Sequence, residues 1–203
     1  MERKKLESAA AHYAYLRGLF SIPLGTLFIL AALGNWEWGP LRHTWVFFGA
    51  VLVVGAACLP INRYYNENYG RVTPSTRQQF RAVVAIIVSV AVMVGAAFLL
   101  RSRAGWSLDL PVNPIAASFG LLMLAYYAIV VGLRAHHSII WGALLVAGLL
   151  PVWGGVDLSN TSNVGLVLTG VAVMANGIFD HLLLVRTFGS SKGLNVENSD
   201  VGA

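Results

Sequence analysis

Apolar residues fill most of this 203-residue chain in six stretches, and short polar segments separate them. A helix needs about 20 such residues to cross about 30 Å of hydrocarbon, because every backbone group must be paired within the segment. Six stretches near this length predict an all-α fold, that of a polytopic integral membrane protein built as a six-helix bundle. The predicted spans cover residues 18–36, 44–61, 82–100, 115–133, 138–156 and 164–185.

The segments around these stretches indicate one membrane domain, residues 1–188. The polar residues 189–203 are predicted to form a disordered tail. The longest predicted connection covers residues 62–81, where Ser75 and Gln78 have the spacing of a capping box that would start the third span. Pro151 interrupts the fifth stretch, so the helix is expected to weaken there.

Lysine and arginine are unevenly distributed between alternate connections. Eleven of the 14 fall in the amino-terminal segment, the second and fourth connections and the tail. The other three fall in the first and third connections, which lie on the opposite side of the membrane from the eleven. Cytoplasmic segments carry the basic excess, so both termini are predicted to be cytoplasmic in a multi-pass protein of the cell (inner) membrane. Five of the six tryptophans then lie at the outer interface, and all seven tyrosines lie in the inner half or inner connections.

The composition of the chain also limits which class of protein it can be. Charged residues make up only 11% of the chain, whereas soluble domains carry about 25%. The net charge of +5 comes from alternate connections rather than one face, so nucleic acid is not an expected partner. Cys58 is the single cysteine, which excludes an intrachain disulfide. No GxSxG, HExxH or glycine-rich phosphate motif is present, which makes an enzyme the less favoured class, and no cofactor is predicted.

The sixth span carries the most costly polar group. Asp180 lies within the apolar stretch, and Thr169 and Asn176 share a helical face with it, extended by Gly165. This face is predicted to point into the bundle. Two interpretations stay open, a polar path with a proton or cation site, and an ion pair that fixes helix packing. The candidate pairing groups are Arg17, Arg134, His136 and His137.

The fourth span supplies further candidates. Gly120, Tyr127 and Arg134 recur every seven residues and are predicted to share a face, so Tyr127 and Arg134 can both reach Asp180 if that face meets the sixth span. A tyrosine hydroxyl that simply extends toward the inner interface is the alternative. Histidines at 12, 136, 137 and 181 lie at the predicted inner end, but their spacing has no metal-site signature, so no metal ligands are predicted.

Tyr64, Tyr65 and Tyr69 are interspersed with arginine in the connection 62–81. They are candidate contacts for a cytoplasmic partner, and the alternative is an interfacial segment lying against anionic headgroups.

The leading functional hypothesis is a non-enzymatic, membrane-embedded partner or accessory subunit. The first alternative is a small transporter or permease that uses the polar face of the sixth span. The second is a membrane enzyme at the cytoplasmic face. The expected partners are the lipid bilayer, another membrane or cytoplasmic protein, and a second copy of the chain.

Overall fold

The computed structural model describes residues 16–69, 80, 84, 112–151 and 158–188. These parts of the chain are helical and contain no strand. Four helical segments are long and apolar enough to cross a membrane, which indicates a membrane protein. They are Gly18–Asn35, Thr44–Tyr69, Pro114–Val131 and Asn160–Thr187.

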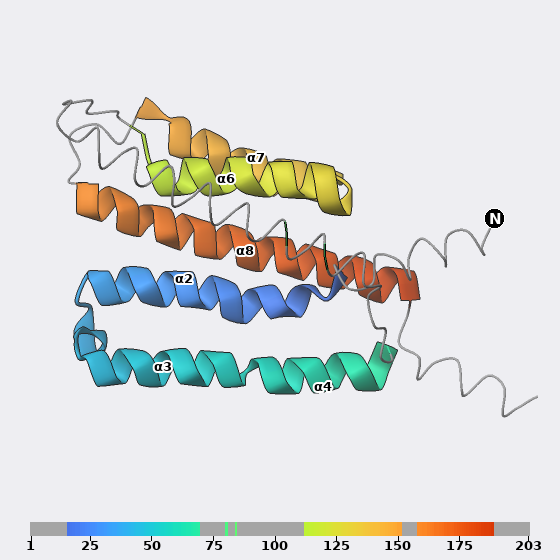
Figure 1. Cartoon of the computed structure of the whole chain (residues 1–203), viewed down its shortest axis with the longest axis horizontal. Helices are drawn as coiled ribbons and strands as arrows, with labels where there is room; N and C mark the ends of the chain where they lie inside the picture. The colour runs from blue at the N-terminus through green and yellow to red at the C-terminus, as the bar shows by residue number, and fades with distance from the viewer. Residues whose placement is uncertain (1–15, 70–79, 81–83, 85–111, 152–157, 189–203) are drawn as a thin grey trace, which may run out of the picture.

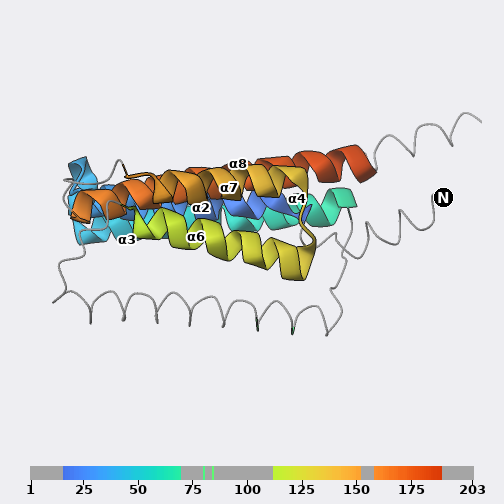
Figure 2. The same ribbon diagram turned by 90° about the horizontal axis from the view of Figure 1, so that it is seen from above.

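The helices are aligned side by side with one long central member, α8 (Leu158–Phe188) (Figure 1). On one side α8 packs against α2 (Ser21–Asn35) and the preceding 3₁₀ turn η2 (Gly18–Phe20), and α3 (Thr44–Ala56) lies beyond α2. On its other side α8 packs against α6 (Pro114–Tyr126) and α7 (Ala135–Leu149). The turned view in Figure 2 shows the same near-parallel alignment of the helix axes.

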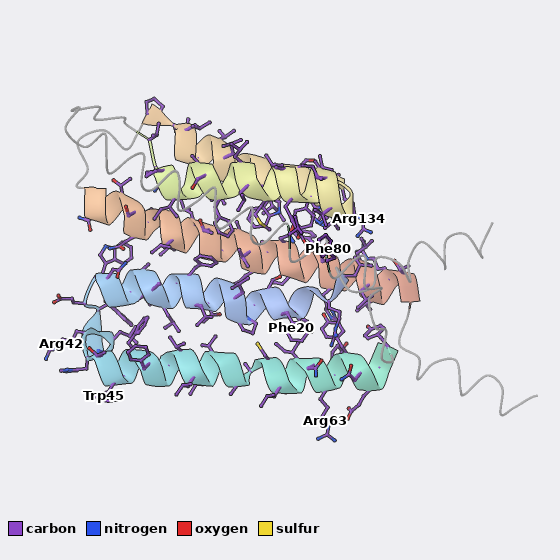
Figure 3. All side chains as sticks on the ribbon, viewed as in Figure 1. Phe20, Arg42, Trp45, Arg63, Phe80 and Arg134 are labelled. Atoms are coloured by element: carbon purple, nitrogen blue, oxygen red, sulfur yellow. The ribbon has the colours of Figure 1, made fainter. Side chains whose placement is uncertain are left out.

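The two ends of the bundle differ in composition. Arg42 and Trp45 project from one end, and Arg63 and Arg134 lie toward the other (Figure 3). The first is called here the tryptophan end, since Trp36 and Trp38 also lie in the α2–α3 connection. The second is called the histidine end, after His136 and His137 at the start of α7.

The second predicted span extends further than its apolar stretch. The helix breaks between α3 and α4 (Cys58–Tyr69) because Pro60 has no N–H to donate to the carbonyl of Ala56. Beyond the break α4 runs to Tyr69, so the prediction of a loop from residue 62 is wrong for residues 62–69. Two contacts favour the helix there, an Arg63–Glu67 pair at 2.6 Å and the complete burial of Tyr65.

The fourth span agrees with the prediction within two residues, whereas the fifth helix ends earlier than predicted. The α6 helix ends in a π turn, η4 (Tyr127–Val131), and Gly132 then takes a φ of +97° that only glycine adopts without strain. The α7 helix begins three residues before the predicted start and ends ahead of Pro151, at Leu149. Its 15 residues span about 22 Å, less than a bilayer core.

The sixth predicted span lies wholly inside α8, which is longer at both ends. The polar tail and the third span apart from Val84 fall outside the described residues. The same is true of Ser75 and Gln78, of residues 152–156 of the predicted fifth span, and of the amino-terminal basic residues other than Arg17. The six-span count is therefore supported for four helices, with α7 as a shorter fifth apolar helix.

Glycines bring the backbones of α2 and α8 into direct contact. A Cβ at Gly18 would overlap the carbonyl of Gly177, and a Cβ at Gly25 would overlap that of Gly170. Gly18 in η2 and Gly25 in α2 are seven residues apart, as are Gly170 and Gly177 in α8. The antiparallel pairs therefore meet two turns apart on one seam. Small residues allow this close approach between membrane helices. The seam fixes the register of α8, and with it the position of every polar side chain on its other face.

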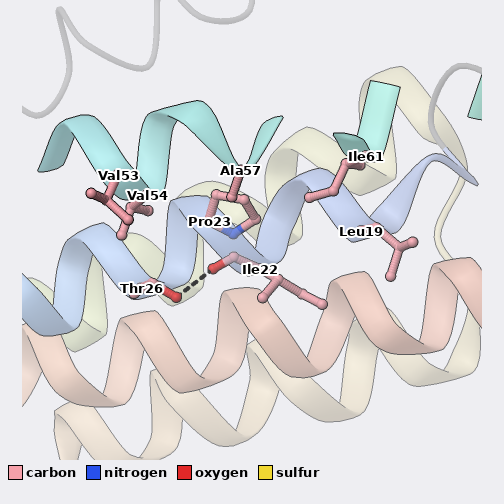
Figure 4. A pocket seen from close by; sticks show the side chains of 8 residues that line it. All are labelled: Leu19, Ile22, Pro23, Thr26, Val53, Val54, Ala57 and Ile61. Atoms are coloured by element: carbon pink, nitrogen blue, oxygen red, sulfur yellow. Dashed lines mark hydrogen bonds between the residues drawn. The ribbon is translucent and has the colours of Figure 1, made fainter. Parts of the chain in front are cut away.

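An apolar groove of about 290 Å³ separates α2 from α3 and α4 (Figure 4). Pro23 lies in the first turn of α2, where its missing N–H costs no helical hydrogen bond, and faces Ala57 near the α3–α4 break. The only polar side chain of the lining is that of Thr26, whose hydroxyl donates to the Ile22 carbonyl at 2.9 Å. This side of the bundle is therefore looser and more apolar than the side toward α6 and α7.

Candidate functional site

The polar face of α8 points into the bundle, as predicted. Gly165, Thr169, Asn176 and Asp180 are all buried, and Asp180 is only 3% exposed. Because the glycine seam occupies the face toward α2, these residues meet α6 and α7 instead.

Asp180 is held by three side chains. The Nε2 atoms of His136 and His137 lie 3.0 Å and 3.1 Å from its Oδ1 atom. The amide of Asn176, one helical turn earlier, donates to its Oδ2 atom at 2.9 Å. Both carboxylate oxygens are therefore engaged, one by the two imidazoles and the other by the amide.

His136 and His137 are brought to Asp180 by the tight link after the π turn. Gly132 reverses the chain, and α7 begins at Ala135, so both imidazoles lie in the first turn of α7 beside the end of α6. Adjacent helical residues point about 100° apart, yet long side chains near a helix end can converge. His137 is fully buried, whereas the side chain of His136 is 20% exposed and connects the cluster to the surface.

Tyr127 supports the cluster from the π turn. Its ring stacks on that of His137 with centroids 3.7 Å apart, and its hydroxyl accepts a hydrogen bond from the Asn176 amide at 2.7 Å. It thus reaches Asp180 through Asn176. Single π turns inside helices occur often at functional sites, because they shift a side chain out of the regular helical phase.

Arg134 contacts the cluster through its backbone and not, as predicted, through its side chain. Among the described residues, no ion pair joins its guanidinium to Asp180. Its backbone N–H instead lies 3.4 Å from Nδ1 of His137. This places the acceptor nitrogen of His137 at Nδ1 and the donor N–H at Nε2, toward Asp180.

Three buried polar atoms on α7 and α8 have no partner among the described residues. They are the amide oxygen of Asn176, the hydroxyl of Thr169 and the indole nitrogen of Trp141. Buried polar groups are usually paired, and unpaired ones point to water, an ion or a ligand. Asn176 is the closest of them to Asp180, so its free oxygen enlarges the set of possible ligand atoms.

A second polar cluster lies between α4 and α8. The hydroxyl of Tyr65 accepts from the Leu19 amide at 3.0 Å and lies 3.1 Å from Nδ1 of His181. The Arg17 guanidinium is stacked 4.9 Å from the Tyr65 ring centroid and donates to Asn62 at 2.8 Å. These contacts bind η2, α4 and α8 together at the histidine end.

The three tyrosines proposed as partner contacts are thus placed unequally. Tyr65 is fully buried and its neighbour Tyr69 is partly so, with ring contacts between them. Tyr64 is 37% exposed and packs its edge against Tyr65. Only Tyr64 presents a substantial surface to the outside of the described bundle.

At the tryptophan end, Asn113 joins three helices and was not singled out from the sequence. It caps α6 by accepting from the Ala116 amide at 3.1 Å, and its own amide donates to the Thr161 carbonyl at 2.6 Å. Its backbone N–H donates to the Gly148 carbonyl at 2.7 Å. The Asn113–Pro114 pair, an N-cap followed by proline at the first helical position, is the signal that identifies it.

Two imidazoles and a carboxylate offer three ligand atoms that all lie within 4.8 Å of one another. The sequence spacing gave no reason to expect this, because the convergence depends on the link between α6 and α7 and on the register of α8. A cluster of this kind can bind a cation or hold helices together by hydrogen bonds. Comparison with protein-family models, with curated proteins and with solved structures finds no match for this chain.

Proposed function

We propose that this chain is a small cation transporter or permease whose binding site is the cluster of Asp180, His136 and His137. The proposal places six spans in the cell membrane with both termini in the cytoplasm, on the basis of the basic residues in alternate connections. The histidine end then faces the cytoplasm, and the site lies in the inner half of the membrane.

The observation that carries the proposal is the buried carboxylate with two imidazoles on one oxygen. A carboxylate inside a membrane span is expensive, so its presence needs a compensating role. Packing alone can be supplied by neutral amides, as Asn113 does at the tryptophan end. A cluster with one anionic group and two nitrogen ligands adds the ability to hold a positive charge.

A cation transporter also needs access to the site and polar groups beyond it. The partly exposed His136 supports access from the histidine end. On the other side, the unpaired oxygens of Asn176 and Thr169 continue along α8 toward the tryptophan end. Thr169 lies eleven residues before Asp180, which is about 16 Å along the helix axis. Together these groups support a polar path along the interior face of α8.

The accessory-subunit hypothesis rests on weaker support, because Tyr65 is engaged inside the bundle and only Tyr64 is substantially exposed. The enzyme hypothesis finds no nucleophile paired with a base among the described contacts of the site. Transport is thus the alternative that the geometry favours.

Flux measurements on purified protein in liposomes test the proposal. Vesicles loaded with dyes for protons, sodium, potassium and divalent metals should show uptake of at least one cation above empty vesicles. Asp180→Asn should abolish that uptake and keep the fold, since an amide retains the shape and can still accept from the histidines. His43→Ala, a histidine substitution at the opposite end, is the matched control. Absence of flux for every cation would overturn the proposal.

A further inference from the structure

We infer that the cluster binds a divalent transition-metal ion through Nε2 of His136, Nε2 of His137 and Oδ1 of Asp180. This rests on the proposed function only in assigning the metal as cargo, because binding itself can be measured without transport.

The distances from Oδ1 to the two imidazole nitrogens are already close to those that a metal requires. Tetrahedral zinc binds nitrogen and oxygen at about 2.0–2.1 Å, which puts neighbouring ligand atoms about 3.3 Å apart. The two imidazole nitrogens lie 3.0 Å and 3.1 Å from Oδ1. For these two separations a metal needs an expansion of only about 0.3 Å. The three ligand atoms all lie within 4.8 Å of one another, which also bounds the separation of the two imidazole nitrogens.

Neighbouring side chains hold the three ligands in place. Asn176 engages the other carboxylate oxygen, so Oδ1 stays directed at the imidazoles. Tyr127 stacks on the ring of His137, and the ring of Phe179 lies against that of His136 at 28°, with centroids 6.0 Å apart. Metal sites depend on such outer groups, which orient the ligands before the metal arrives.

The ligand types select the class of ion. Two imidazoles and one carboxylate suit Zn²⁺, Co²⁺, Ni²⁺ and Fe²⁺, whereas Mg²⁺ and Ca²⁺ prefer oxygen ligands alone. Three protein ligands leave a position open for water or for a further ligand, unlike closed structural sites with four protein ligands.

Metal binding replaces the two hydrogen bonds between the imidazoles and Oδ1 and also affects the contact between His137 and Arg134. A metal on Nε2 of His137 moves the ring proton to Nδ1, which then faces the Arg134 N–H as a second donor. The contact between Arg134 and His137 is long at 3.4 Å, so losing it costs little. The metal-bound state should therefore lose the hydrogen bond between the N-cap residue of α7 and the third residue of that helix.

Cobalt(II) absorption tests the inference. Tag-free protein in detergent micelles is titrated with CoCl₂, and the visible bands of tetrahedral Co²⁺ should saturate at one ion per chain and disappear on addition of zinc. Asp180→Asn and His136→Gln should each weaken binding about 100-fold or more, beyond the 10–100-fold typical for an outer-shell group. His43→Ala should bind as the wild type does.

The outcomes separate the inference from the proposed function. No saturable cobalt band in folded protein, or a band unchanged in Asp180→Asn and His136→Gln, overturns the metal site. Flux of protons, sodium or potassium without cobalt binding would leave the transporter standing and reject the metal. Cobalt binding in protein that transports no cation would leave the site standing and reject transport. His136→Gln, at the partly exposed ligand, keeps the test informative if Asp180→Asn does not fold.

Discussion

The two faces of α8 contact their neighbouring helices through opposite kinds of surface. Toward α2 the helix presents Gly170 and Gly177, and contact comes from the absence of side chains. Toward α6 and α7 it presents Asn176 and Asp180, and contact comes from long polar groups that reach across. Close contact between backbones allows only one register of α8 against α2. The polar side chains can exchange their hydrogen bonds for a ligand, so the face toward α2 fixes the position of the face that can bind one.

The largest effect should come from filling the glycine seam. In Gly177→Leu the new side chain would meet the Gly18 carbonyl and the side chain of Ser21, and overpacking of this kind costs about 3 kcal/mol or more of unfolding free energy. Titration with sodium dodecyl sulfate in mixed micelles measures the loss.

Gly142→Ala is the matched control, because nothing lies within 4 Å of a Cβ at that position. It should be neutral or gain up to about 1 kcal/mol from better helix propensity. Equal destabilisation by the two variants would contradict the seam.

Removing the asparagine at the tryptophan end should weaken the fold and spare the site. Asn113→Ala removes the α6 cap and the bond to the Thr161 carbonyl, for a loss of about 2 kcal/mol. Cobalt affinity should stay within about twofold of wild type, because the change lies at the other end of α8. A collapse of metal binding at unchanged stability would show that the two ends are not independent.

Loss of an outer group should give a graded effect on the polar face. Asn176→Ala frees one oxygen of Asp180 and the Tyr127 hydroxyl, and cobalt binding should weaken about 10–100-fold. The effect should be smaller than that of Asp180→Asn in the same titration. The reverse order would mean that Asn176 is a ligand in its own right.

The smallest expected effect is at the second cluster. Tyr65→Phe keeps the ring packing and removes the hydroxyl that joins Leu19 and His181, for a loss of about 1 kcal/mol. Stability in mixed micelles should fall by this amount, with cobalt binding unchanged. A loss above about 3 kcal/mol would mean that this hydroxyl is part of a larger network.

The sequence predicted the polar face of α8 well because one helix with a regular period determines it. Thr169, Asn176 and Asp180 needed only the helical repeat to be placed together. The partners of Asp180 required more information. Gly120, Tyr127 and Arg134 were expected on one face. The π turn and Gly132 interrupt that helix, and Arg134 is instead the N-cap of α7. The hydropathy pattern also placed the end of the second span at Ile61. The helix continues because Tyr65 is buried on it, and a pattern of apolar residues cannot predict the burial of one side chain in a polar helix.

The stacking of Tyr127 on His137 limits how many residues can connect them. The π turn, Gly132 and the first turn of α7 form this connection and contain no extra loop residues that could absorb a change in length. Loss or gain of one residue there would rotate His137 by about 100° away from Asp180. In any relatives of this chain that keep the cluster, the interval from 127 to 137 should have constant length, while the α2–α3 connection is free to vary.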